Sequence, residues 1–175
     1  EGKIRYRDER LEIKTGLHRV ALQEFHKTRP NVRLKTPKYY PRTGYDIAIE
    51  LALDFIKSSP TIIFTAVRNH VDSIGEGLLN QIKKRQSQDA NFSLVSDNKS
   101  KKALEKLARI VEQRLGDNFP LAQYIREGFA YHHGDLPDDL RTAIEESFRH
   151  EHIPILIATP TLAQGVNLPV HLMIV

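Results

Sequence analysis

The 175-residue sequence contains no cysteine, which excludes disulfide bonds and thiolate metal sites and is consistent with a reducing compartment. It has no run of eighteen or more apolar residues, so no membrane-spanning helix is predicted. The first five residues are mostly charged and lack the apolar run of a secretion signal. We therefore expect an intracellular location, cytoplasmic in a bacterial source, and no membrane contact.

Several catalytic and ligand-binding motifs are also missing. The sequence has no Gly-x-x-x-x-Gly-Lys-Ser/Thr phosphate loop, no Asp-Glu-x-His/Asp magnesium motif and no Gly-x-Ser-x-Gly nucleophile motif. Gly75 and Gly77 resemble part of a dinucleotide loop, but they lie in an amphipathic segment and the third glycine is absent. His150 and His152 lack metal-ligand spacing, so no metal site is predicted. Phosphoryl transfer by this chain alone is therefore not expected.

Positive charge is concentrated near the start of the sequence. The net charge is +4, yet residues 1–42 hold twelve Lys and Arg against five Asp and Glu. Two interpretations stay open for this basic arm. It is either a solvated hairpin with long cationic side chains or a segment that contacts a phosphate backbone.

The pattern of the chain changes near residue 42. Apolar and polar residues alternate over residues 3–15, which predicts a small β-hairpin. Residues 28–42 contain three prolines and are typical of an extended linker. We therefore predict a basic hairpin and linker over residues 1–42 and a separate domain over residues 43–175.

The second segment alternates amphipathic helices with short apolar strands. The strands are expected at residues 61–65, 129–132, 153–158 and 171–175. Strands that are apolar throughout and separated by helices predict a parallel sheet with helices on both faces, an α/β fold.

Two helix starts are also expected. Thr43 is predicted to cap a helix that presents Ile47, Leu51 and Phe55 on one face, and Asp135 is predicted to cap a later helix.

Polar groups follow three of the predicted strands at residues 65–68, 132–135 and 159–169. These segments are rich in hydroxyls, amides, glycine and imidazole, and each precedes a helix whose first N–H groups are free. Ligands of parallel α/β sheets gather at the carboxyl ends of the strands. The pattern predicts an edge that binds a polyanion or a nucleotide, without identifying a reaction.

Residues 158–169 resemble motif V of superfamily-two (DEAD/DEAH-type) helicases, in the form used by the superkiller-type branch. Residues 128–141 are similar to the segment that precedes motif V in that branch, and residues 61–68 resemble motif IV. The resemblance covers roughly residues 43–175. It implies the second RecA-like (P-loop NTPase-type) domain of a helicase, with a sequence that ends before motif VI and so belongs to a longer parent.

The resemblance also implies residue roles. The residues that match nucleic-acid-binding positions are Thr65, Arg68, His133, Gly134, Arg141, Thr159 and Thr161. The residues that match positions facing the ATP cleft are Gln164, Gly165 and Asn167. ATP and Mg would be bound mainly by the first motor domain, which this sequence does not contain, and no catalytic residue is expected here.

Most of these assignments have a structural alternative that the sequence leaves open. Thr159 and Thr161 can instead cap the short helix after their strand, and Arg68 can be a solvated helix residue. Arg141 can form an ion pair with Glu145 four residues later. The first histidine of the pair at residues 132–133 is expected to be packed in the core, and the second can be packed or functional.

The implied partners are single-stranded nucleic acid or an unwinding duplex, and a RecA-like domain that precedes this one in the same polypeptide. RNA and DNA are not distinguished, because contacts to phosphates carry no base information. Two alternative functions stay open. One is a duplex DNA translocase that does not unwind, and the other is a degenerate, non-catalytic domain that serves as an interaction module.

Overall fold

In the computed structural model the chain forms two compact units, residues 1–54 and 55–175. The structure describes the backbone of residues 3–7, 10–14 and 19–24, and both backbone and side chains of residues 43–55, 60–159, 162, 170 and 172–175. The unit boundary lies one helix later than the predicted domain boundary at residue 42. The predicted linker at residues 28–42 lies outside the described residues.

The first unit contains a three-stranded antiparallel sheet in the order β1-β2-β3. Its strands are β1 (Lys3–Arg7), β2 (Arg10–Lys14) and β3 (Arg19–Glu24). Ile4 lies opposite Ile13, which in turn lies opposite Val20. The predicted hairpin is therefore extended by a third strand that the sequence analysis missed.

Helix α1 (Gly44–Phe55) begins with the predicted cap. The Asp46 N–H donates to Thr43 Oγ1 at 3.2 Å and the Thr43 N–H donates to Asp46 Oδ2 at 2.9 Å, a reciprocal capping box. The predicted face of Ile47, Leu51 and Phe55 is half-buried. The fully buried residues are Ala48, Ile49, Glu50, Ala52 and Leu53. Apolar residues cover all of this helix except the stripe of Asp46, Glu50 and Asp54, so the apolar face is broad and its sequence does not single out the buried part.

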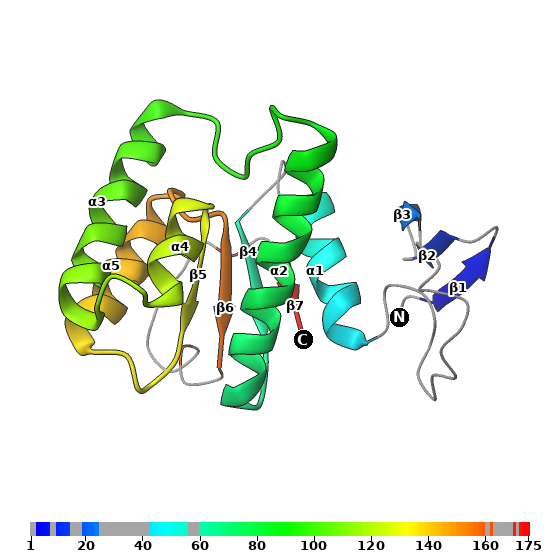
Figure 1. Ribbon diagram of the computed structural model, residues 1–175. Coiled ribbons are helices and arrows are strands. Elements are labelled where there is room, and N and C mark those ends of the chain that lie inside the picture. Colours follow the sequence, from blue (N-terminus) through cyan, green and yellow to red (C-terminus); the bar gives the residue numbers. More distant parts are fainter. Residues whose placement is uncertain are drawn as a thin grey trace, which may run out of the picture. The chain divides into compact units, whose positions relative to one another are not determined.

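The second unit contains a four-stranded parallel sheet in the order β5-β6-β4-β7, with helices around it (Figure 1). Its strands are β4 (Thr61–Phe64), β5 (Phe129–His132), β6 (Ile155–Ala158) and β7 (Leu172–Ile174). Every residue of β5 and β6 is buried. The sheet confirms the predicted α/β class, since strands covered on both faces have no polar alternation.

Between β4 and β6 the described residues form four helices, namely α2 (Arg68–Gln88), α3 (Asn98–Leu115), α4 (Pro120–Arg126) and α5 (Asp138–Arg149). In the strand order β5-β6-β4-β7, the connection from β4 to β5 crosses β6 toward one edge of the sheet. The connection from β5 to β6 then runs in the opposite direction. Because such crossovers are right-handed, this reversal places α2 and α5 on opposite faces of the sheet. No helix in the described part of the chain is both long and apolar enough to cross a membrane.

Helix α4 was missed by the sequence analysis. Pro120 looks like a helix breaker, but at the first helical position it costs no hydrogen bond. The helix buries Tyr124, whose ring stacks on Phe129 with centroids 4.8 Å apart. A Cβ at Gly75 would lie 2.8 Å from the Tyr124 ring. Gly75 therefore lies in α2 as expected, and it permits close helix packing there.

Candidate nucleic-acid interface

The carboxyl ends of β4, β5 and β6 are level with one another. Phe64 and His132 are both register partners of Ala158. The next residues continue the ladder, because the Thr65 N–H donates to the Ala158 carbonyl at 2.9 Å and the Thr159 N–H donates to the His132 carbonyl at 3.3 Å. The predicted gathering of three strand ends at one edge of the sheet is therefore present.

The two threonines at this edge are buried, with 4% exposure for Thr65 and 8% for Thr159. Thr65 Oγ1 donates to the Val67 carbonyl at 3.2 Å and accepts from the Val67 N–H at 3.4 Å. This turn ends β4 and leads into α2. The Thr159 carbonyl accepts from the Leu162 N–H at 3.0 Å. Both residues thus shape a turn, and Thr65 would release the Val67 carbonyl in order to donate to a phosphate.

His133 follows β5 and is buried beside the same edge. Its Nδ1 accepts from the Asp135 N–H at 3.2 Å, and its ring stacks on Tyr131 with centroids 5.1 Å apart. An acceptor at Nδ1 places the proton of the neutral ring on Nε2. Burial, followed by the nearby Arg68 charge, lowers the pKa of His133. The ring is therefore neutral at pH 7 and offers Nε2–H as an uncharged donor.

Arg68 and Asp135 form an ion pair between the start of α2 and the loop after β5. The predicted capping role of Asp135 is wrong, because α5 begins at Asp138 with Pro137 at its N-cap. Asp135 instead connects two of the three loops at the strand ends. Sequence reasoning missed this pair, since nothing in either segment indicates which distant loop its side chain meets.

The proposed pair between Arg141 and Glu145 is also wrong. Arg141 pairs with Asp138 one turn earlier in α5. The Glu145 carboxylate is taken by His132, whose Nε2 lies 2.7 Å from Glu145 Oε1. His132 is 3% exposed, as expected for a packed core histidine. Glu145 therefore fastens α5 to the end of β5.

The remaining predicted site residues differ in what the structure says of them. Gly134 is exposed, and a Cβ there would meet no heavy atom within 4 Å, so packing does not require glycine. The other predicted residues lie outside the described residues, and their roles stay predictions: Thr161, Gln164, Gly165 and Asn167. In the described ranges no group of three or more His, Asp or Glu side chains could hold a metal ion.

A cavity of about 600 Å³ adjoins the strand ends. The start of α2, the loop between α3 and α4, and the end of β5 form its walls. Tyr124 and Tyr131 line it, and burial raises the pKa of both hydroxyls. Asp72 lines it as well and adds to both shifts. The phenols are therefore protonated, and the cavity combines neutral donors with negative charge.

Comparisons with known proteins agree with this geometry. Residues 104–175 match the family described as helicase conserved C-terminal domain. The ATP-dependent DNA helicase Hel308 of Thermoplasma volcanium is 34% identical over 129 residues, which is 71% of this chain and 18% of that protein. Hel308 of Thermoplasma acidophilum is 32% identical over 138 residues, 77% of this chain and 19% of that protein.

A human protein, the probable ATP-dependent DNA helicase HFM1, is 30% identical over 132 residues. The match covers 75% of this chain and 8% of the human protein. The chain therefore spans less than a fifth of the length of these curated relatives.

Proposed function

The chain belongs to the superkiller-type branch of superfamily-two helicases, as a second RecA-like domain, and we propose that it is the strand-gripping motor domain of an ATP-dependent DNA helicase. The observation that supports this most is the level end of β4, β5 and β6, where Thr65, His133 and Thr159 adjoin. DNA is proposed as the substrate because the similar proteins are named DNA helicases.

The grip is made by hydrogen-bond donors rather than by a cluster of cations. Thr65 and Thr159 offer hydroxyls, and His133 offers Nε2–H from a neutral ring. Such donors bind phosphate oxygens whatever the base sequence of the strand. This suits a motor that moves along a strand. Arg68 is held by Asp135, so its main part is to keep two loops together while it adds positive charge near the phosphate.

ATP and Mg are proposed to bind mainly to a preceding RecA-like domain. The sequence has no phosphate loop, and the described residues contain no group that fits a metal. This chain would supply one wall of the cleft, through Gln164, Gly165 and Asn167. Thr159 and Thr161 grip the strand within the same short segment, so closure and reopening of the cleft would move that grip along the strand.

The chain itself provides the first test. We expect purified chain to bind fluorescein-labelled oligo(dT) weakly and with strong salt dependence, as measured by fluorescence anisotropy. The double variant His133→Ala/Thr159→Val should bind at least roughly a hundredfold more weakly, since each lost hydrogen bond to a charged group contributes about 1.5 kcal/mol or more. Thr43→Val, which removes an exposed helix cap, is the control. Equal affinities for the chain and the double variant would contradict the proposed grip.

ATP turnover and its coupling provide the second test. The chain alone should show no ATP hydrolysis, and measurable turnover by purified material would overturn the partial-motor proposal. In a polypeptide that also carries the first motor domain, Thr161→Ala should reduce the stimulation of ATPase by single-stranded DNA. Unchanged stimulation in that variant would remove Thr161 from the mechanism.

A further inference from the structure

Helix α3 has two faces of opposite character. Its core face consists of Ser100, Leu104, Leu107, Ala108 and Val111, all buried. The other side carries five cations, which we name the α3 basic face: Lys99, Lys101, Lys102, Lys106 and Arg109. At about 100° per residue Lys102, Lys106 and Arg109 lie opposite the core face, with Lys99 and Lys101 at its two sides. All five are exposed to solvent.

The single acidic residue among these cations is already occupied. Glu105 accepts from Arg109 Nε and from Arg126 Nε, both at 2.9 Å. Arg126 also binds Glu112 at 2.6 Å. Arg126 and then Arg109 lower the pKa of Glu105, so its charge persists and is neutralised locally. Glu105 therefore does not neutralise the positive charges of the neighbouring lysines.

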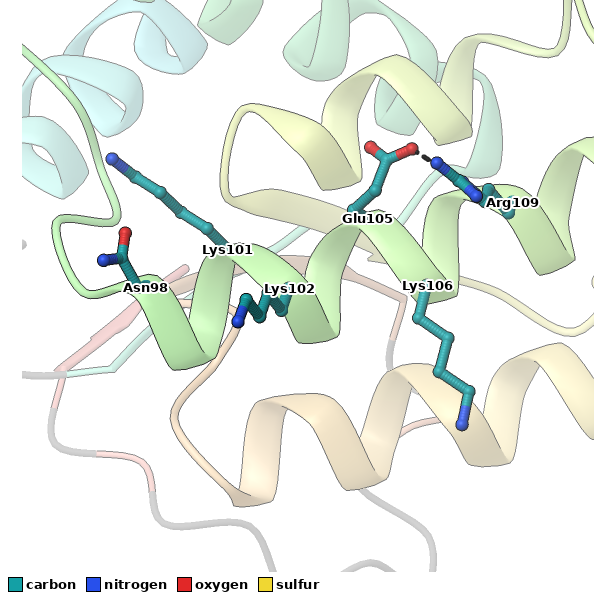
Figure 2. A pocket seen from close by; sticks show the side chains of 6 residues that line it. All are labelled: Asn98, Lys101, Lys102, Glu105, Lys106 and Arg109. Atoms are coloured by element: carbon teal, nitrogen blue, oxygen red, sulfur yellow. Dashed lines mark hydrogen bonds and ion pairs between the residues drawn. The ribbon is translucent and has the colours of Figure 1, made fainter.

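The lysines of this face have no such partner. Figure 2 shows Glu105 turned toward Arg109, while Lys101, Lys102 and Lys106 project from α3 in separate directions. In the described part of the chain no carboxylate pairs with any of these three ammonium groups. They line a shallow hollow of about 460 Å³ on the surface of α3. An array of unpaired positive charges on a rigid helix is a surface for an anion.

We propose that the α3 basic face binds the phosphate backbone of duplex DNA. This contact would be additional to the one at the carboxyl ends of β4, β5 and β6. This inference rests on the proposed helicase function, because that function is the reason for choosing nucleic acid as the partner. A motor that separates strands meets duplex as well as single strand, and a face of point charges holds duplex without reading its sequence.

An acidic protein is a poorer fit to this face. Protein interfaces have an apolar core and are depleted in lysine. The exposed large hydrophobic residues among the described positions are Val67, Met173 and Val175, and none belongs to α3. Single-stranded DNA is also a poorer fit, because its binding sites add aromatic side chains for base stacking and α3 contains none. Duplex offers the densest row of phosphates.

The test compares a blunt duplex of about 20 base pairs with oligo(dT) of the same length and label, titrated with the chain at several NaCl concentrations. Lys101→Gln/Lys102→Gln/Lys106→Gln should weaken duplex binding roughly tenfold or more and reduce the salt slope by up to about 2.7, since each phosphate contact contributes about 0.9. Oligo(dT) binding should change far less. Glutamine keeps a high helix propensity, and circular dichroism checks that α3 persists.

Matched single variants separate a local contact from a general loss of charge. Lys102→Gln and Lys83→Gln each remove one exposed cation, the first from α3 and the second from α2. Only Lys102→Gln should weaken duplex binding. Equal losses from both, or an unchanged duplex affinity in the triple variant, would overturn the inference. So would a triple variant that loses binding to poly-glutamate but not to duplex, because the face would then suit an acidic protein.

Failure of this inference differs from failure of the proposed function. If only the α3 contact is wrong, oligo(dT) binding still depends on His133 and Thr159. If the proposed strand grip is wrong, the affinity for oligo(dT) does not change when His133 and Thr159 are substituted, whatever the effect of the α3 variants.

Discussion

His132 and His133 are neighbours in the chain with opposite surroundings. Successive side chains of a strand point to opposite faces, and β5 ends between these two residues. His132 turns to Glu145 on α5 at 2.7 Å, so it joins helix and sheet. His133 turns to Tyr131 and to the cavity at the strand ends. One histidine therefore fastens the scaffold, and the other can meet a ligand.

The lowered pKa of His133 makes the stability of the chain depend on pH. The unfolded chain takes up a proton near its ordinary pKa of about 6.5, whereas the folded ring resists protonation. The unfolded state therefore binds more protons below about pH 6.5, and the free energy of unfolding should fall there as pH decreases. Urea denaturation at about pH 7.5 and about pH 5.5 measures the difference. His133→Gln should reduce it.

The control is His150→Gln, which removes an exposed histidine from the end of α5. A reduction of the pH dependence that occurs in His133→Gln and not in this variant assigns the effect to His133. A His133→Gln chain with an unreduced pH dependence would show that another group is responsible.

The residues at the strand ends could be predicted because short apolar runs fix where buried strands stop. Thr65, His133 and Thr159 were located in this way. The pairs Arg68–Asp135 and His132–Glu145 could not be predicted. Side-chain partners from different segments depend on the relative placement of loops and helices, which no local pattern of residues encodes.

At the scale of elements, the absence of a side chain at Gly128 lets the loop before α3 lie close to the start of β5. This glycine has a φ of +96°, a backbone region that other residues rarely adopt. A Cβ there would also lie 2.9 Å from Leu94 Cβ and from Val95 Cγ2. The close approach lets Val95, a buried residue of this loop, pack against Gly128.

Gly116, the C-cap of α3, is a natural comparison for Gly128. It has a φ of +100°, but a Cβ added there would meet no heavy atom within 4 Å. Gly116→Ala should cost only the backbone strain, about 1–3 kcal/mol, because its φ of 100° and ψ of 153° lie in a region that is essentially restricted to glycine. Gly128→Ala should cost that strain plus about 1–3 kcal/mol of overpacking. Urea denaturation measures both, and equal losses would mean that the loop moves away from Gly128 without cost.

The elements themselves were largely predictable, with informative exceptions. Helices α2, α3 and α5 have clear apolar stripes, and β4, β5 and β6 are uniformly apolar. Helix α4 was missed because it is short and begins with Pro120. The most buried part of α1 was not predicted, because apolar residues fill most of its circumference and leave one acidic stripe. Periodicity thus predicts an element well when its apolar face is narrow, and poorly when the element is short or its apolar face is broad.

At the scale of the whole molecule, the uneven charge has a counterpart in the first sheet. Lys3 lies opposite Lys14, which lies opposite Arg19, and Arg7 lies opposite Arg10. Like charges directly opposite one another destabilise a sheet. Opposite charges are aligned in the same sheet, because Arg5 lies opposite Glu12 and Arg10 lies opposite Glu24. The basic arm therefore keeps its two interpretations, a solvated hairpin or a contact with a phosphate backbone.

If the arm contacts a phosphate backbone, removal of two of these cations should have opposite effects on folding and on binding. Lys3→Gln/Lys14→Gln lowers the net charge from +4 to +2 and removes both like-charged pairings of Lys14, with Lys3 and with Arg19, so thermal stability should stay equal or rise. Affinity for oligo(dT) should fall, with the salt slope reduced by about 1.4, because each phosphate contact with a single strand contributes about 0.7. Lys83→Gln/Arg149→Gln removes the same charge from the second unit and should leave that slope nearly unchanged. If the two double variants reduce the slope equally, the arm is a solvated hairpin and its repulsions have no role in binding.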